Sequence, residues 1–252
     1  MRRLLALAAF AVAAGSLGLA YYWAASPSSQ AYGAIVRNGP RQLPLVALTF
    51  DDGPNPPWSL AIADVLERYG VRGAFFLVGE NVKAYPEVAQ QLAARGHLVA
   101  DHSYRHRKRD SLLDPRYREL DRAQEAIAEA TGLCPALYRP PNGFHTPWQL
   151  RTVAARGMVT VGWDVQPSDW TETSAEELVR RVLSSARPGS IILLHDGLDT
   201  RHGADRSSTL AALPGIIEGL QARGLHPVRL DELLAVAPYL PDCPRTAHRK
   251  GA

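Results

Sequence analysis

Cysteine and lysine are both scarce in this sequence, and arginine supplies nearly all of the positive charge. The two cysteines, Cys134 and Cys243, are too few to define a disulfide framework, although they could pair in an exported protein. Cys134 is not expected to be a catalytic thiol, because no histidine or asparagine pattern of a thiol hydrolase accompanies it. The net charge is only +3, and no block of basic residues is interleaved with aromatic ones. Nucleic acid is therefore not an expected partner.

The densest basic run in the chain is Arg105–Arg109. Runs of this kind are usually solvated surface segments, and we expect a solvated loop here. The alternative is a basic rim that attracts an anionic polymer.

The first 25 residues form a long apolar stretch that begins with two arginines. Met1–Arg3 is basic, and residues 4–23 come close to the ~20 apolar residues needed to cross a bilayer. Tyr21–Trp23 resembles an interfacial aromatic belt, and the arginines would stay in the cytoplasm, which places the rest of the chain outside. Ala24–Ser26 could equally host signal cleavage. Residues 1–25 are therefore expected to be a signal peptide or a membrane anchor, and both alternatives stay open.

Composition divides the rest of the chain into three segments. Residues 26–43 are rich in Ser, Pro, Gly and Gln without a strong period, which indicates a linker. A folded domain is expected over residues 44–237, a length that supplies ample material for a core. The tail, residues 238–252, is expected to be flexible unless Cys243 pairs with Cys134.

From residue 44 onward, apolar strands and helices alternate about seven times, which predicts an α/β fold. Strands without polar alternation favour a parallel sheet covered on both faces, either a barrel or an open doubly wound sheet. No glycine-rich phosphate turn follows the first strand, which argues against a dinucleotide-binding fold. The predicted strands are 45–50, 72–78, 97–100, 136–139, 158–164, 190–194 and 226–229. The predicted helices are 59–68, 86–95, 115–130, 147–156, 174–187, 208–223 and a short one from residue 231.

Two adjacent carboxylates, Asp51 and Asp52, end the first predicted strand and precede the turn-forming pair Gly53-Pro54. Parallel strands of a barrel carry their catalytic residues at this end. Two like charges in a semi-buried site raise one pKa, and a bound cation removes that conflict. The alternative is an Asx turn with solvated acids.

Further polar residues follow other predicted strands, so the topology would bring them together. His102 and His106 are four residues apart, and on a helical turn both imidazoles would lie on one side and could bind one ion. With one carboxylate they form a site that leaves positions open for water and substrate, as a catalytic zinc requires. Taken singly, each histidine is more often an ordinary surface residue. The other residues at strand ends are Arg139, Asp169, Trp170, His195 and Asp196.

These residues form five ordered motifs that resemble the polysaccharide deacetylases, carbohydrate esterase family 4, also called the NodB-homology domain. The resemblance covers Leu45 to about Val236. It implies a distorted (β/α) barrel, often counted as seven-stranded. The motifs are Thr49-Phe50-Asp51-Asp52-Gly53-Pro54, His102-Ser103-Tyr104-Arg105-His106, Arg139-Pro140-Pro141-Asn142-Gly143, Asp169-Trp170 and Leu193-Leu194-His195-Asp196.

The resemblance implies a divalent metal on Asp52, His102 and His106, usually zinc, with cobalt or nickel also compatible with these ligands. It assigns Asp51 as the general base and places Arg139 beside it, where the cation would keep the carboxylate ionised.

The resemblance also implies roles on the far side of the pocket. The backbone N–H of Asn142 would stabilise the oxyanion, and His195 would be the general acid, with Asp169 raising its pKa. Trp170 and Leu193 would shape the acetyl pocket. The family often has tyrosine at the position of Asn142 and aspartate at the position of Gln166, so the sugar platform and one polar network could differ here.

The implied function is hydrolytic removal of N-acetyl groups from N-acetylglucosamine-type units of an extracytoplasmic polysaccharide. Peptidoglycan, an exopolysaccharide and chitin-like oligomers are the candidate substrates. An O-acetyl (xylan-type) esterase and an inactive carbohydrate-binding module on the same fold are the alternatives. The sequence indicates no oligomeric state, and a membrane contact is expected only if the N-terminal segment is uncleaved.

Overall fold

Parallel strands alternate with helices along the chain in the computed structural model, which describes residues 2–243. The strands are β1 (Leu45–Asp51), β2 (Ala74–Leu77), β3 (Leu98–Asp101), β4 (Leu137–Tyr138), β5 (Val159–Thr160), β6 (Ile191–His195) and β7 (His226–Pro227). The helices are α1 (Arg2–Ala25), α2 (Trp58–Arg68), α3 (Gly79–Ala84), α4 (Pro86–Ala94), α5 (Lys108–Leu113), α6 (Arg118–Thr131), α7 (Pro147–Ala155), α8 (Ala175–Ser185), α9 (Ser207–Ala222) and α10 (Leu230–Leu234). A 3-10 turn, η1, spans Pro141–Gly143.

The strands form one parallel sheet in the order β5-β4-β3-β2-β1-β6, and β7 pairs with the start of β1. The register places Asp51, at the end of β1, beside Phe76 of β2 and His195 of β6. Asp101, at the end of β3, lies beside Tyr138 of β4. Because parallel strands end at the same edge, the residues that follow β1, β3, β4 and β6 are gathered there.

The sheet closes into a distorted barrel through an isolated bridge between the segment that follows β5 and strand β6. Val165, just after β5, pairs in parallel with Ile192 of β6, and the Leu193 N–H donates to the Val165 carbonyl at 2.9 Å. The predicted fold class, a distorted barrel of about seven parallel strands, is therefore confirmed.

Part of the segment predicted to be a linker lies in the barrel wall. Val36 pairs in parallel with Val161, and Asn38 pairs antiparallel with Ser190. Ile35, next to Val36, is buried. This segment thus lies between the residues that follow β5 and those that precede β6, although the domain boundaries 26–43 and 44–237 stay predictions.

Two apolar clusters cover the two faces of the sheet. Phe75 belongs to the cluster between the sheet and the outer helices, where its ring stacks on Phe50 at 5.1 Å. Phe76 points to the opposite face and belongs to the cluster inside the barrel. Since successive strand residues point to opposite faces, strands buried on both sides are apolar throughout. This explains the absence of polar alternation in the sequence.

Two short helices were not predicted from the sequence. The α3 and α5 helices each have 6 residues, too few to show a helical period. Lys108, expected in a solvated loop, begins α5, although Arg107–Arg109 is exposed as expected. The helix predicted from residue 115 begins at Arg118, because Tyr117 has a left-handed backbone.

The tail residues that the structure describes are held against the barrel. Tyr239 pairs with Pro135 ahead of β4, and its hydroxyl accepts from the Val99 N–H. Cys134 and Cys243 form a disulfide with a Cα–Cα distance of 5.2 Å. The pairing left open by the sequence is thus present, while residues 244–252 of the predicted flexible tail lie outside the described residues.

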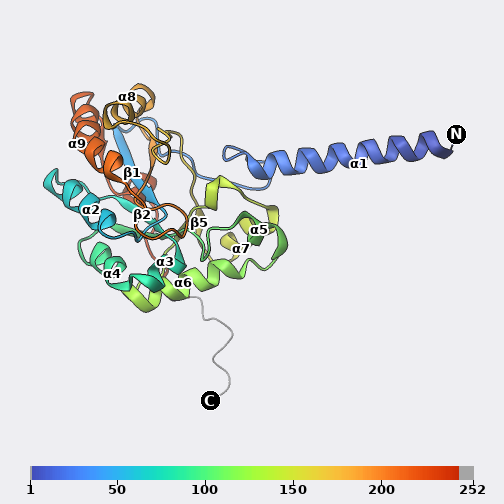
Figure 1. Cartoon of the computed structure of the whole chain (residues 1–252), viewed down its shortest axis with the longest axis horizontal. Coiled ribbons are helices and arrows are strands. Elements are labelled where there is room, and N and C mark those ends of the chain that lie inside the picture. Colours follow the sequence, from blue (N-terminus) through green and yellow to red (C-terminus); the bar gives the residue numbers. More distant parts are fainter. Residues whose placement is uncertain (1, 244–252) are drawn as a thin grey trace, which may run out of the picture.

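Helix α1 projects away from the barrel (Figure 1). Its residues Leu5–Ala25 are apolar and long enough to cross a membrane. This is compatible with either a signal sequence or a membrane anchor.

Replacing Phe75 with alanine should destabilise the barrel. Because Phe75 has no exposed surface, Phe75→Ala should cost about 3–5 kcal/mol of unfolding free energy. The control Leu113→Ala, at a side chain that is 79% exposed, should change it by less than about 0.5 kcal/mol. Chemical unfolding of the full chain in detergent would measure both, and equal effects would contradict the described core.

Candidate metal and active site

A pocket of about 370 Å³ opens at the carboxyl edge of the sheet. It lies where the register brings the ends of β1 and β6 together. Arg139 and Asp169 are not part of its lining but lie directly behind lining residues. The lining residues are Pro27, Asp51, Asp52, His102, His106, Asn142, Trp163, Gln166, Trp170, Leu193, His195, Leu198, Asp199 and Arg201.

Asp52, His102 and His106 converge on one point of this pocket. The Oδ1 atom of Asp52 lies 3.2 Å from His106 Nε2 and 3.4 Å from His102 Nε2. The candidate ligand atoms all lie within 4.8 Å of one another. Asp52 Oδ1 is buried and has no hydrogen-bond partner among the residues that the structure describes. A buried anionic oxygen between two imidazole nitrogens fits a divalent cation.

The other nitrogen of each imidazole is held by an oxygen, which leaves both Nε2 atoms facing Asp52. His102 Nδ1 donates to the Arg139 carbonyl at 2.8 Å. His106 Nδ1 lies 2.7 Å from Asp199 Oδ1. Such partners fix the tautomer and orientation of a metal-binding histidine. No motif in the sequence points to Asp199, which lies far from His106 in the chain.

The two histidines change the pKa of Asp52. Burial raises the pKa of Asp52, but the positive charges of His106 and His102 and a hydrogen bond with His102 lower it well below its usual range. Asp52 is therefore ionised, as a metal ligand must be.

The predicted helical turn between the two histidines is wrong. Residues 102–107 form a loop, in which Ser103 and His106 have left-handed backbones with φ of 68° and 55°. The Ser103 hydroxyl accepts from the His106 N–H, and Asp101 Oδ1 accepts from the Ser103 N–H. The imidazoles still meet, with ring centroids 4.8 Å apart, because the loop folds back on itself.

Asp51 lies beside this cluster and is held by a buried arginine. Arg139 Nη1 donates to Asp51 Oδ1 at 2.6 Å and to the Thr49 hydroxyl at 2.9 Å. The guanidinium also lies 4.0 Å from the centre of the Phe76 ring. Asp51 Oδ2 lies 3.5 Å from His102 Nε2, so its free oxygen faces the same space as the candidate metal ligands.

His195 stands across the pocket and is paired with Asp169. Its Nδ1 donates to Asp169 Oδ1 at 2.8 Å, and its backbone N–H donates to Asp169 Oδ2 at 2.8 Å. Thr209, which sequence reasoning missed, donates its hydroxyl to the same carboxylate. Burial lowers the pKa of His195. The charge of Asp169 and the hydrogen bond between Asp169 and the imidazole outweigh burial and raise this pKa to about 9. His195 therefore carries a proton at neutral pH.

The remaining predicted residues form the walls of the pocket. Asn142 is exposed in the 3-10 turn with φ of 54°, and the indole of Trp170 lies 5.2 Å from the His195 ring. Leu193 is buried at the base. Trp163, which was not predicted, lines the pocket and donates to Gln166 Oε1 at 2.6 Å. At this position, where the family often has an aspartate, Gln166 thus accepts a hydrogen bond from the indole of Trp163.

Comparison with known proteins identifies the family. The family described as polysaccharide deacetylase matches residues 38–161. A peptidoglycan-N-acetylglucosamine deacetylase of Bacillus cereus is 32% identical over 204 residues, which cover 80% of this chain and 93% of that protein. The chain belongs to the polysaccharide deacetylase family. Among other members, a chitooligosaccharide deacetylase of Sinorhizobium fredii is 38% identical over 194 residues, which cover 72% of this chain and 87% of the relative.

A solved member of the family has the same architecture. It is a peptidoglycan N-acetylglucosamine deacetylase in complex with 4-naphthalen-1-yl-N-oxidanyl-benzamide, and it superimposes with a TM-score of 0.76. The sequences are 29% identical, and the match covers 82% of this chain and 95% of that structure. The family assignment and the barrel predicted from the sequence are both confirmed.

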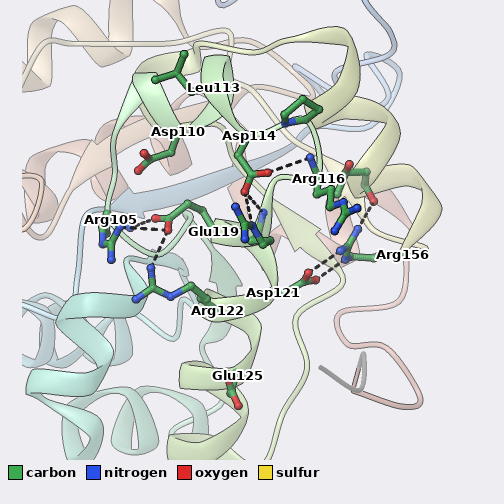
Figure 2. Close-up of a pocket in the computed structure, with 13 residues that line it drawn as sticks. Arg105, Asp110, Leu113, Asp114, Arg116, Glu119, Asp121, Arg122, Glu125 and Arg156 are labelled. Atoms are coloured by element: carbon green, nitrogen blue, oxygen red, sulfur yellow. Dashed lines mark hydrogen bonds and ion pairs between the residues drawn. The ribbon is translucent and has the colours of Figure 1, made fainter. Parts of the chain in front are cut away.

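A second hollow, of about 1240 Å³, lies beside α6, and none of the three candidate metal ligands lines it (Figure 2). Several of its charged side chains are paired with one another: Arg156 lies 2.5 Å from Asp121, and Arg122 lies 3.0 Å from Glu119. Arg105, from the basic run, lies 3.9 Å from Glu119. These three arginines each have a carboxylate partner, and of the basic run only Arg105 lines this hollow.

Removing Asp199 should weaken metal binding. Its carboxylate orients His106, so Asp199→Ala should lower affinity for Zn²⁺ about 10–100-fold. The control Asp205→Ala removes an exposed carboxylate outside the pocket and should bind like the unaltered chain. Isothermal titration with Zn²⁺ would measure both variants, and unchanged affinity in Asp199→Ala would contradict the orienting role.

The pKa of His195 should depend on Asp169. In the metal-free chain, NMR titration should place it near 9, and Asp169→Asn should lower it, because burial is then opposed only by the more weakly acting charges of Asp52 and Asp51. Because the pKa is higher in the folded chain, protonated His195 contributes to the free energy of unfolding. This contribution is fully present below about pH 6.5 and is lost as the pH rises through about 9. If the NMR titration midpoint of His195 were the same in Asp169→Asn as in the unaltered chain, the pairing of His195 with Asp169 would be contradicted.

Proposed function

We propose that this chain is a metal-dependent hydrolase that removes N-acetyl groups from N-acetylglucosamine-type units of an extracytoplasmic polysaccharide. The observation that carries the proposal is the placement of two acid–base groups around one candidate metal centre. Asp51 turns a free oxygen toward Asp52 and the two imidazoles, and His195 lies across the same pocket.

The proposed metal ligands are Asp52, His102 and His106. A divalent ion bound there would supply Lewis acidity to the acetyl carbonyl and lower the pKa of a water. Zinc is the proposed ion, since it accepts two imidazoles and one carboxylate and leaves positions open; cobalt and nickel suit the same ligands.

Asp51 is the proposed base. It takes a proton from the water whose oxygen attacks the acetyl carbon, and Arg139 Nη1 holds its other oxygen at a distance of 2.6 Å. The carbonyl oxygen becomes negative in this step, and the backbone N–H of Asn142 is the proposed donor to it.

His195 is the proposed acid. It gives its proton to the sugar nitrogen as the carbon–nitrogen bond breaks, which releases acetate and a free amine. Asp169 favours the protonated imidazole before this step and fixes its orientation through Nδ1. Leu193 and Trp170 would contact the acetyl methyl group at the base of the pocket.

The peptidoglycan and chitooligosaccharide relatives support a polymer or oligomer of N-acetylglucosamine as the substrate. Helix α1 supports export, with the barrel outside the cytoplasm. An O-acetyl esterase would need the same groups, whereas an inactive binding module would not need all of Asp51, Asp52, His102, His106 and His195 in place.

Acetate release tests the proposal. The full chain should release acetate from N-acetylglucosamine oligomers, and a chelator should abolish it. Asp51→Asn should lower kcat by about 10²–10⁴-fold, because the general base is lost. Metal content, measured on the same samples, should stay unchanged.

The matched control is Asp205→Asn, an exposed acid outside the pocket that should keep its activity. Release from O-acetylated xylan alone would favour the esterase. No release from either substrate class would favour the inactive module.

A further inference from the structure

The outer end of α1 is docked on the loop that carries Asn142. The His145 N–H donates to the Ala24 carbonyl at 3.0 Å. The rings of Tyr21 and Phe144 lie 6.1 Å apart. Ala24 is 4% exposed, whereas its neighbours along α1 are exposed to solvent. The helix thus ends in a specific contact with the barrel.

The chain that leaves α1 becomes a wall of the catalytic pocket. Pro27, two residues after the end of α1, lines this pocket. It packs so closely on Gly143 that a Cβ there would come within 2.5 Å of the Pro27 ring. Gly143 adjoins Asn142, the proposed oxyanion donor. A shift of the helix end would therefore move the oxyanion loop.

The length of α1 places this pocket close to a bilayer. Its 21 apolar residues span about 31 Å, which matches a hydrocarbon core of about 30 Å. The docked residues Tyr21–Ala25 then lie at the outer boundary of that core. Two further residues reach at most about 7 Å, so Pro27 and the pocket wall lie at the depth of the headgroups.

A second surface fits the same placement. Helix α5 lies on the side of the barrel from which α1 projects (Figure 1). Arg107, Lys108 and Arg109 are exposed at its start, and Leu112 and Leu113 are 42% and 79% exposed at its end. Basic residues beside exposed leucines suit an anionic headgroup layer above an acyl boundary.

We propose that α1 is retained as a membrane anchor and that its docked end holds the catalytic pocket at the bilayer surface. The substrate is then N-acetylated glycan attached to, or lying on, the membrane, an inference that rests on the proposed deacetylation. Cleavage at Ala24–Ser26 would break the contact with His145 and leave a charged amino terminus beside Pro27. Retention keeps this wall intact.

The intact mass of the chain recovered from membranes tests retention. The full chain of 27.5 kDa is expected. A mature chain that begins between residues 25 and 27 would overturn the proposal, whatever its activity.

A matched pair of variants tests the docking. Ala24→Trp places a large ring in the contact with the barrel, and Ala25→Trp places the same ring on the exposed neighbour. In vesicles, Ala24→Trp should lower kcat/KM on a free N-acetylglucosamine tetramer about 10–100-fold, since the oxyanion loop is displaced. Ala25→Trp should match the unaltered chain.

Zn²⁺ content and thermal unfolding of both variants would separate displacement from misfolding. Loss of activity with bound metal and an unchanged melting temperature supports docking. Equal activity of the two variants overturns it. If Ala24→Trp does not fold, Tyr21→Ala, which removes the ring next to Phe144, is measured in its place, and unaltered kcat/KM in that variant overturns docking.

The position of the substrate is tested with lipid-linked tetramers in the same vesicles. One tetramer is joined to its lipid by a short spacer, and the other by a flexible polyethylene glycol spacer of about 100 Å. A pocket at the headgroups should deacetylate the short-spacer substrate at least about tenfold faster than the free tetramer at equal total concentration. Turnover of the long-spacer substrate without the short-spacer one would overturn the proposal. If no form of the tetramer releases acetate, the proposed function itself fails.

Discussion

Arg139, which has no exposed surface, connects the barrel wall to the proposed base and to one proposed metal ligand. It donates to Asp51 and Thr49 of β1 and to the Gly162 carbonyl after β5, while its own backbone carbonyl accepts from His102. A buried cation of this kind is tolerated only with its anion, and removing one partner typically costs about 3–5 kcal/mol. The position of the proposed base therefore depends on the side chain of Arg139, and the orientation of one proposed metal ligand depends on its backbone carbonyl.

Asp51 and Asp52 are neighbours in the sequence, yet they have different partners. Adjacent residues of a regular strand point to opposite faces. Asp52 has a left-handed backbone with φ of 76°, so the strand ends there and both carboxylates reach the same pocket. Asp51 is then neutralised by the arginine and Asp52 by the imidazoles, which resolves the repulsion that two close carboxylates would otherwise suffer.

The features that could be predicted from the sequence are those set by local pattern. Apolar runs gave the strands, and the position of Asp51, His102, Arg139 and His195 after them gave the members of the pocket. The predicted helical turn between the two histidines is wrong, because the loop depends on left-handed residues that a spacing of four does not indicate. Asp199 and Thr209 could not be found, since each reaches its partner only through the closed barrel.

The bridge made by the segment before β1 has a consequence for shortened forms of this protein. The Val36 N–H donates to Thr160, and the Val36 carbonyl accepts from Gly162. A chain trimmed to start at Leu45 would leave these β5 groups without partners on an open strand edge. Unpaired edges are templates for intermolecular pairing, so such a form would tend to aggregate even with every pocket residue in place.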